Sequence, residues 1–207
     1  MIGLRKMPGD WEEAVCMREQ EEAPEGCILL YGSSHFACWR EDWMTRQMAP
    51  YRPVNRAFGG STAEEALYYY PRLVRPAAPR ALLYYEGDND LALGYTPSEV
   101  WELSKRVLAW ARHDAPGRLP IVLLGLKHAP ARAVLRPFQD AYNALLRDAA
   151  ADDPDMVYVD QAPYLEDEAG RVKTELYSED LLHVNEAGYD GVAEALKEAL
   201  RRLGVRP

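Results

Sequence analysis

The chain has 207 residues, a length that one α/β domain can fill while burying a substantial core. Its net charge is −9 and its arginines are scattered, which argues against a nucleic-acid partner. No apolar run reaches the length of a membrane span, and the charged N-terminus lacks the apolar core of a signal peptide. The three cysteines have neither the even count of a disulfide framework nor the C-x-x-C spacing of a structural zinc site. We therefore expect one cytoplasmic domain over residues 1–207, without membrane insertion, that acts on a small molecule.

Five short apolar runs predict β-strands, and they fall at residues 27–32, 53–60, 80–87, 119–126 and 155–161. Three of these runs are nearly continuous apolar stretches without the alternation of a half-exposed strand. That pattern is typical of parallel strands that are buried on both faces of a sheet.

Helical patterns surround these runs and cover about residues 9–23, 61–73, 96–114, 131–151 and 186–203. Two of them begin with a capping box, in which a Ser or Thr and a Glu three residues later bond each other's backbone N–H groups. We expect one box at Ser61 and Glu64 and the other at Thr96 and Glu99. Pro137 marks either a kink or a late start of its helix.

Strands and helices alternate from residue 27 to the end of the chain. With short, right-handed connections, this alternation predicts an open parallel sheet covered by helices on both faces. Residues 1–24 carry no strand signal and are expected to form an amphipathic, helical N-terminal extension.

Polar, glycine-containing clusters follow the first three predicted strands, and another precedes the last helix. They are GSSH (32–35), GGST (59–62), GDND (87–90) and SEDLLHVNEAGY (178–189). In an open parallel sheet, ligands bind beyond the carboxyl ends of the strands. We therefore expect the four clusters to meet at one edge.

These clusters contain the groups that acyl transfer requires. Ser34 can act as a nucleophile if a neutral imidazole, that of His183, takes its proton. Asp180, three residues earlier, is placed to hold the imidazole in the correct tautomer. The backbone N–H groups of Ser34 and Gly60 and the side-chain amide of Asn89 are the expected oxyanion donors. The G-x-S-x-G elbow of the α/β-hydrolases is absent.

With these motifs the sequence resembles the SGNH hydrolases, the GDSL esterase/lipase superfamily, over about residues 26–204. The resemblance assigns the nucleophile block to GSS (Ser34), the second block to FGGST (Gly60), the third to GDND (Asn89) and the last to DLLH (Asp180 and His183). Each motif alone is weak, but the four occur in the family's order, each at its expected place relative to the predicted strands and the last helix.

Three positions depart from the family pattern. Ser33 stands where the family usually carries aspartate, and Ala57 and Leu181 stand where related sequences often carry glycine. None of these removes a catalytic group. The resemblance implies a flavodoxin-like α/β/α sandwich with five parallel strands, no metal or organic cofactor, and a broad range of ester substrates.

Four further residues near the predicted edge, His35, Ser61, Asp90 and His128, are candidates for the substrate pocket. Asp90 has a second interpretation, in which it bonds local backbone and holds the turn that contains Asn89. No metal site is expected, because the aspartates of this edge lack the spacing of a calcium loop.

We interpret the chain as a serine esterase that hydrolyses small carboxylic esters through an acyl-enzyme intermediate. The sequence contains no long apolar lid, which favours short acyl groups such as acetyl; thioesters also remain candidates. Two alternatives are a flavodoxin-like module that binds a small molecule and a catalytically silent member of the family. Ser34 would then serve only to cap a helix over residues 35–44. No pattern indicates an oligomeric state.

Overall fold

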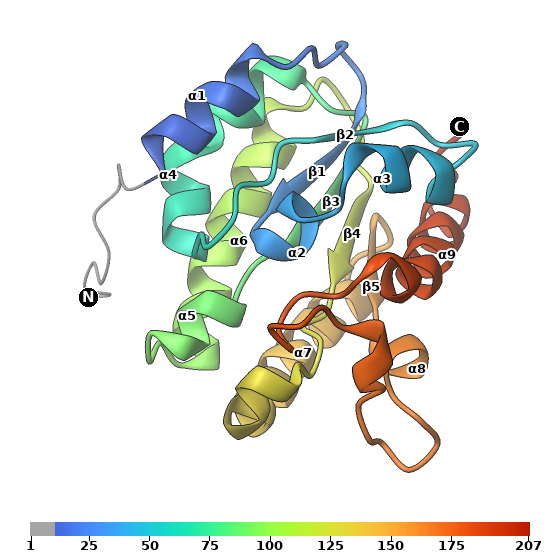
Figure 1. Cartoon of the computed structure of the whole chain (residues 1–207). Helices are drawn as coiled ribbons and strands as arrows, with labels where there is room; N and C mark the ends of the chain where they lie inside the picture. The colour runs from blue at the N-terminus through green and yellow to red at the C-terminus, as the bar shows by residue number, and fades with distance from the viewer. Residues whose placement is uncertain (1–10) are drawn as a thin grey trace.

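Five parallel strands form the central sheet of the protein, and the computed structural model describes residues 11–207. The strands are β1 (Ile28–Gly32), β2 (Pro53–Asn55), β3 (Ala81–Tyr85), β4 (Ile121–Leu124) and β5 (Met156–Val159). They lie in the order β2-β1-β3-β4-β5, and every neighbouring pair is parallel (Figure 1). This is the order of flavodoxin-like folds, in which the chain reverses its direction across the sheet next to β1. The predicted fold class is confirmed.

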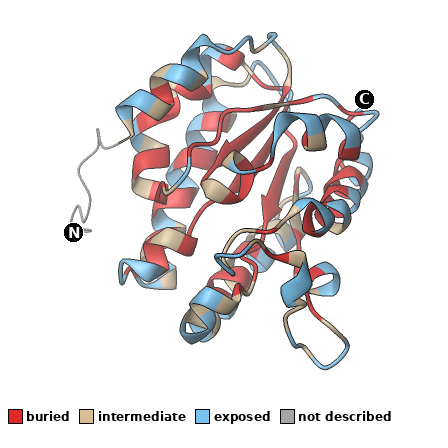
Figure 2. Cartoon of the chain, in the orientation of Figure 1, coloured by how far each residue is buried: buried red, intermediate tan, exposed pale blue. Residues whose placement is uncertain are grey.

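Burial on both faces explains the continuous apolar runs of the central strands. Every residue of β1, β3 and β4 is buried (Figure 2). Leu83 of β3 lies in register with Leu30 of β1 and with Val122 of β4. Complete burial of a side chain of this size contributes about 1.5–3 kcal/mol, so these strands form the stable centre of the core.

The edge strand β2 is shorter than the predicted run over residues 53–60. Its contact with β1 nevertheless continues beyond Asn55. The Arg56 N–H donates to the Leu30 carbonyl over 2.9 Å, and the Phe58 N–H donates to the Gly32 carbonyl over 3.0 Å. The rest of the run forms the turn into the next helix.

Helices cover both faces of the sheet. They are α1 (Glu12–Gln20), α2 (Ser34–Ala37), α3 (Glu41–Gln47), α4 (Ala63–Leu73), α5 (Asp88–Ala92), α6 (Pro97–Asp114), α7 (Arg136–Ala151), α8 (Ala162–Leu165) and α9 (Glu186–Arg202), with short 3-10 helices η1 (Arg75–Ala77), η2 (Pro130–Leu135) and η3 (Thr174–Leu176). Helices α4, α6 and α7 pack on one face and α3 and α9 on the other (Figure 1). Among the described residues, no helix is long and apolar enough to cross a bilayer.

Two helices begin as expected. Thr96 and Glu99 form the predicted capping box of α6, in which the Glu99 carboxylate accepts from the Thr96 N–H over 2.7 Å. Helix α7 begins at Arg136 with Pro137 in its first turn, so the late start is the correct interpretation of this proline. Proline is tolerated there because the first N–H groups of a helix have no intrahelical acceptor.

The capping box of α4 is shifted by one residue from the prediction. Thr62 and Glu65 form the box, and the predicted pair of Ser61 and Glu64 is wrong. The Ser61 hydroxyl instead donates to the Glu86 carboxylate over 2.6 Å.

Helix α1 lies within the predicted N-terminal extension, of which residues 1–10 lie outside the described part of the chain. Its amphipathic character is slight, since Val15 is its one buried residue. Ion pairs from Arg72 of α4 to Glu12 and Glu19 hold it against the rest of the protein.

The helix predicted over residues 35–44 is interrupted between α2 and α3. The ring of Trp39 stacks on Tyr189 of α9, with 4.8 Å between the ring centroids. Its indole N–H donates to the Gln47 side chain over 2.8 Å. These contacts draw Trp39 into the core and break the helix there.

Candidate active site

The turn after β1 brings Ser34 to the carboxyl edge of the sheet. Gly32 ends the strand, the Ser33 N–H donates to the Tyr85 carbonyl of β3 over 3.0 Å, and Ser34 begins α2. Gly32 has φ +144°, and a Cβ there would lie 1.9 Å from that carbonyl oxygen, so the close approach requires glycine. Ser34 is half-buried, and a Cβ on Gly59 would lie 3.8 Å from its own Cβ. The turns after β1 and β2 therefore run side by side.

Gly60 lies in the turn between β2 and α4 and has φ +80°, a conformation that favours glycine. The indole of Trp11, from the residue before α1, covers this turn. A Cβ on Gly60 would lie 3.4 Å from the indole ring, and the indole N–H donates to the Gly59 carbonyl. The sequence did not single out Trp11, because a contact across 48 residues leaves no local signal.

Asn89 of α5 joins the turns that follow three strands. Its Nδ2 donates to the Ser33 hydroxyl and to the Ser61 carbonyl, each over 2.8 Å. Its Oδ1 accepts from Arg132 Nη2 over 2.8 Å. The Ser33 hydroxyl in turn donates to the Ser61 carbonyl over 3.1 Å, a bond that the usual aspartate, when ionised, could not make.

Asp180 and His183 form a local pair in the loop between η3 and α9. Asp180 Oδ2 lies 2.6 Å from His183 Nδ1, and Oδ1 accepts from the backbone N–H groups of Leu182 and His183 over 2.9 and 3.0 Å. Partial burial acts to raise the pKa of Asp180, but these hydrogen bonds outweigh it and lower the pKa to about 2. The ionised carboxylate can only accept, so the proton lies on Nδ1 and the lone pair of the neutral ring on Nε2.

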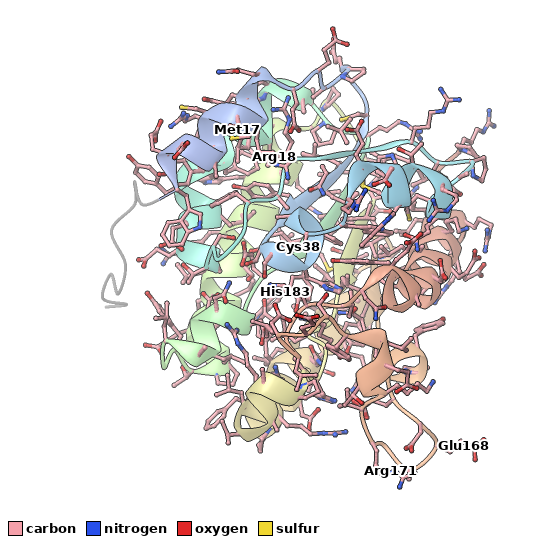
Figure 3. All side chains as sticks on the ribbon, viewed as in Figure 1. Met17, Arg18, Cys38, Glu168, Arg171 and His183 are labelled. Atoms are coloured by element: carbon pink, nitrogen blue, oxygen red, sulfur yellow. The ribbon has the colours of Figure 1, made fainter. Side chains whose placement is uncertain are left out.

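The pair lies beside α2, where Figure 3 shows His183 close to Cys38. Burial and then the charge of Asp180 raise the pKa of the Cys38 thiol, so the Asp180 carboxylate acts on the residue that follows α2. The Nε2 atom of His183 is buried and has no hydrogen-bond partner among residues 11–207. A direct hydrogen bond between Ser34 and His183 is likewise not formed within this part of the chain.

His35 points away from the surface although it follows Ser34 directly. It is 1% exposed, and its ring packs 4.7 Å from the ring of Tyr85. Its Nε2 lies 2.7 Å from the Gln161 side-chain oxygen, and the Gln161 amide donates to the Gly125 carbonyl. The ring is thus the donor to Gln161, and burial holds its pKa well below the usual value.

Ser61 and Asp90 are also buried completely. The Ser61 hydroxyl binds the Glu86 carboxylate, as described above. Asp90 Oδ1 accepts from the Ala63 N–H over 3.0 Å, at the first residue of α4. Asp90 therefore ties the start of α4 to the turn that contains Asn89.

His128 lies between two carboxylates. Its Nε2 is 2.8 Å from Asp140 Oδ1, and its Nδ1 bonds Glu166. Its carbonyl accepts from the Tyr177 hydroxyl over 3.1 Å. Both ring nitrogens are engaged, so neither is free to compete with His183 as a base.

Two cations that the sequence did not single out lie behind the turn containing Asn89. Lys127 is 3% exposed, with Nζ 3.4 Å from the Tyr85 hydroxyl and 3.8 Å from Asp88 Oδ2, and burial lowers its pKa. Arg132 Nη1 lies 3.2 Å from the same Asp88 oxygen. A lysine directly after an apolar strand is the one local signal of this cluster. Within residues 11–207, no three His, Cys, Asp or Glu side chains gather in a way that could hold a metal ion.

The protein is thus a three-layer α/β/α sandwich, and Ser34, Asn89 and the pair of Asp180 and His183 lie at or near the carboxyl edge of its sheet. The chain belongs to the GDSL-like Lipase/Acylhydrolase family, which matches residues 31–190. Membership of this family supports ester hydrolysis as the general activity. No curated protein matches the chain.

Solved structures share the fold at low sequence identity. A protein from Streptococcus pneumonia, assigned as a platelet activating factor, has a TM-score of 0.78 and 20% identity, with 92% of each chain covered. A Bacteroides fragilis protein assigned to the acylhydrolases has a TM-score of 0.78 and 16% identity, covering 97% of this chain and 100% of its own. A GDSL-like lipase from Bacteroides thetaiotaomicron has a TM-score of 0.71 and 16% identity, covering 93% of this chain and 98% of its own.

Proposed function

We propose that the protein is a serine esterase in which His183 activates Ser34. The observation that carries this proposal is the state of the imidazole. Asp180 holds its Nδ1 proton, and the Nε2 lone pair is buried without a partner beside the helix that Ser34 begins. A neutral imidazole with that tautomer is the usual base for a serine hydroxyl. In this proposal, the hydrogen bond between Ser34 and His183 Nε2 forms when substrate binds.

The reaction then follows the acyl-enzyme route. His183 Nε2 takes the Ser34 proton while Ser34 Oγ forms a bond to the ester carbonyl carbon. The resulting tetrahedral intermediate collapses, the C–O bond to the alcohol breaks, and His183 returns the proton to the leaving oxygen. Water, deprotonated by the same ring, attacks the acyl-enzyme and releases the acid.

Asn89 and the N–H groups of Ser34 and Gly60 would stabilise the negative charge on the carbonyl oxygen. Both Asn89 Nδ2 hydrogens bond internal acceptors in the free protein. The bond to Ser33 ends on a neutral hydroxyl, a weaker acceptor than an oxyanion. We expect the oxyanion to take over this hydrogen, while the bond to the Ser61 carbonyl keeps the amide in place.

In this proposal, the other candidate pocket residues stabilise the loops of the site and do not bind substrate. His35, Ser61 and Asp90 are buried and bonded within the protein, so direct contact with substrate is not required of them. His128 braces the neighbouring loops through its carboxylate partners. Small carboxylic esters with short acyl groups such as acetyl are the proposed substrates. We favour this esterase function over the alternative of a module that binds a small molecule without reaction.

Hydrolysis of p-nitrophenyl esters from acetate to octanoate tests the proposal, with Ser34→Ala as the decisive variant and Ser98→Ala, on the outer helix α6, as its matched control. We expect turnover in the wild type and in Ser98→Ala and none above background in Ser34→Ala, with the acetate cleaved fastest. Circular dichroism melts check that all three proteins are folded. Equal turnover in Ser34→Ala and the wild type, or no turnover in any protein, would overturn the esterase proposal.

A further inference from the structure

Arg132 makes its contacts at the turn that carries Asn89, although it comes from the segment after β4. One nitrogen, Nη2, donates to Asn89 Oδ1 over 2.8 Å, and Nη1 donates to the Asp88 carbonyl over 2.5 Å. The side chain is only 18% exposed. The guanidinium thus donates hydrogen bonds to both the backbone and a side chain of the same turn.

Arg132 pairs with the carboxylate of Asp88, which it shares with Lys127 and which is itself fixed. Asp88 Oδ2 lies 3.2 Å from Arg132 Nη1, and Asp88 Oδ1 accepts from the Gln139 amide over 2.9 Å. Gln139 is buried in α7. A buried residue of α7 therefore orients the guanidinium through Asp88, and the guanidinium in turn orients Asn89.

The chemistry of the neighbours allows the Asn89 amide only one orientation. A guanidinium can only donate hydrogen bonds, so Oδ1 must face Arg132. The Ser61 carbonyl can only accept them, so Nδ2 must face Ser61. A flipped amide would set oxygen against oxygen on one side and nitrogen against nitrogen on the other. The cation at Oδ1 also polarises the amide and strengthens its N–H groups as donors.

We propose that Arg132 is a positioning residue that fixes and polarises the Asn89 amide for the oxyanion. The effect on turnover rests on the proposed esterase function, whereas the effect on the amide does not. Loss of Arg132 leaves Asn89 and its Nδ2 bonds in the protein but removes the partner of Oδ1, so the amide is held less firmly and the expected loss is smaller than that of Asn89 itself. Misplacing a catalytic group costs up to about a hundredfold, and removing an oxyanion donor costs about a hundredfold to a thousandfold.

The kinetic test compares Arg132→Ala, Arg132→Lys and the control Arg136→Ala. Arg136 lies four residues further on and binds Glu166 and the Gly170 carbonyl instead of the Asn89 turn. We expect Arg132→Ala to lower kcat about tenfold to a hundredfold with little change in KM. Arg132→Lys should recover part of this loss, since it restores the charge but not the paired donors. Arg136→Ala should turn over like the wild type.

A double-mutant cycle separates positioning from general damage to the fold. In an Asn89→Ala background, Arg132→Ala should cause no further loss of kcat, because the group it positions is gone. Losses that multiply in the double variant, or a wild-type kcat in Arg132→Ala, would overturn the proposal. Thermal melts of each variant confirm that the folded state is being compared.

The side-chain amide signal of Asn89 gives a readout that does not need activity. In the ¹H–¹⁵N spectrum it is assigned by its disappearance in Asn89→Ala. We expect its two protons to shift and to exchange faster with solvent in Arg132→Ala, but not in Arg136→Ala. If the wild type lacks esterase activity and the signal still responds, the esterase function fails and the positioning stands. An unchanged signal in Arg132→Ala overturns the positioning even if the enzyme is active.

Discussion

Asp180 makes two different kinds of contact from one short loop. One carboxylate oxygen accepts two backbone N–H groups and fixes the loop, while the other holds the His183 ring. About half of the side chain is exposed, at 49%, so solvent reaches the carboxylate and the local hydrogen bonds decide its charge state. The Asp180 carboxylate therefore stays ionised until the pH approaches about 2, so it is available as an acceptor for His183 Nδ1 throughout the neutral range.

Asp180→Asn should abolish most turnover while leaving the fold intact. The amide keeps an oxygen for the two backbone N–H groups, but it turns an N–H toward His183 Nδ1. The ring must then carry its proton on Nε2, where it cannot accept the proton of Ser34. We expect kcat for p-nitrophenyl acetate to fall about a thousandfold or more, with a near-normal thermal melt.

Asp167→Asn is the matched control for this change. Asp167 Oδ1 also accepts two backbone N–H groups of its own loop, those of Ala169 and Arg171, each over 2.9 Å, but no histidine is bound. Its substitution should leave kcat within about twofold of the wild type. A small loss of kcat in Asp180→Asn would mean that another group orients the ring.

Residues whose partners are near in sequence could be predicted, and residues whose partners are remote could not. Asp180 and His183 bond across three residues, so their spacing alone indicated the contact. Arg132 reaches Asn89 across 43 residues, and Trp11 reaches Gly59 across 48. Such contacts depend on how helices pack on the sheet, which no local pattern specifies. Leu181 was predictable in part. Its φ of +54° explains why related sequences often carry glycine there, but the hydrogen bond from the Ala131 N–H to its carbonyl could not be predicted from the sequence.

At the level of elements, the type of each segment was predictable and its register was not always so. The run of Ser61, Thr62, Glu64 and Glu65 allows two capping boxes with the same three-residue spacing. The structure uses the second, because Ser61 is taken by the Glu86 carboxylate. The strands, in contrast, were predictable because burial on both faces imposes a continuous apolar run.

Helix α1 contributes to the candidate active site through the contacts at its two ends. It buries little apolar surface of its own, so its attachment depends on polar contacts. Arg18 Nε donates to the Ala57 carbonyl over 2.9 Å, and the Trp11 indole N–H donates to the Gly59 carbonyl. Both contacts hold the turn that contains Gly60, which we propose as an oxyanion donor.

Trp11→Ala should therefore slow turnover although it leaves Ser34, His183 and the proposed oxyanion donors in the chain. Removing the indole uncovers Gly60 and frees the turn, for which we expect a loss of about tenfold in kcat. Trp11→Phe keeps the packing but not the donor, so its kcat should lie between those of Trp11→Ala and the wild type. Met17→Ala, an exposed position of the same helix, is the control. Equal kcat in all four proteins would show that α1 does not hold the oxyanion turn.

At the scale of the whole molecule, the carboxyl edge of the sheet buries three carboxyl groups, a feature that the sequence did not indicate. Glu65, Glu86 and Asp90 are each at most 1% exposed, and among the described residues no lysine or arginine pairs with them. Burial and the neighbouring charge of Asp90 hold the pKa of Glu86 well above its usual value. Burial, opposed by hydrogen bonds from the Ala63 and Asp90 N–H groups, raises the pKa of Asp90 to about 7, with the charge of Glu65 adding to the rise.

Stability should consequently decline as the pH rises toward and beyond 7. An unfolded aspartate ionises near pH 3.9, so between about pH 4 and 7 the unfolded chain releases a proton that folded Asp90 retains. The free energy of unfolding is greatest below the unfolded pKa and falls as the pH rises through the folded pKa. Raised pKa values at both Asp90 and Glu86 act in the same direction.

Asp90→Asn tests this decline by removing one of the two titrations. The amide oxygen can still accept from the Ala63 N–H, and loss of the Asp90 charge should let Glu86 ionise more easily. We expect Tm at pH 8 to rise by several degrees relative to the wild type, since about 1 kcal/mol corresponds to about 2–4 °C in a chain of this size. At pH 4 the gain should vanish, because Asp90 is then protonated in the folded protein. Asp148→Asn, at an exposed position of α7, should follow the wild-type curve throughout. Parallel curves of Tm against pH for Asp90→Asn and the wild type would contradict a raised pKa at Asp90.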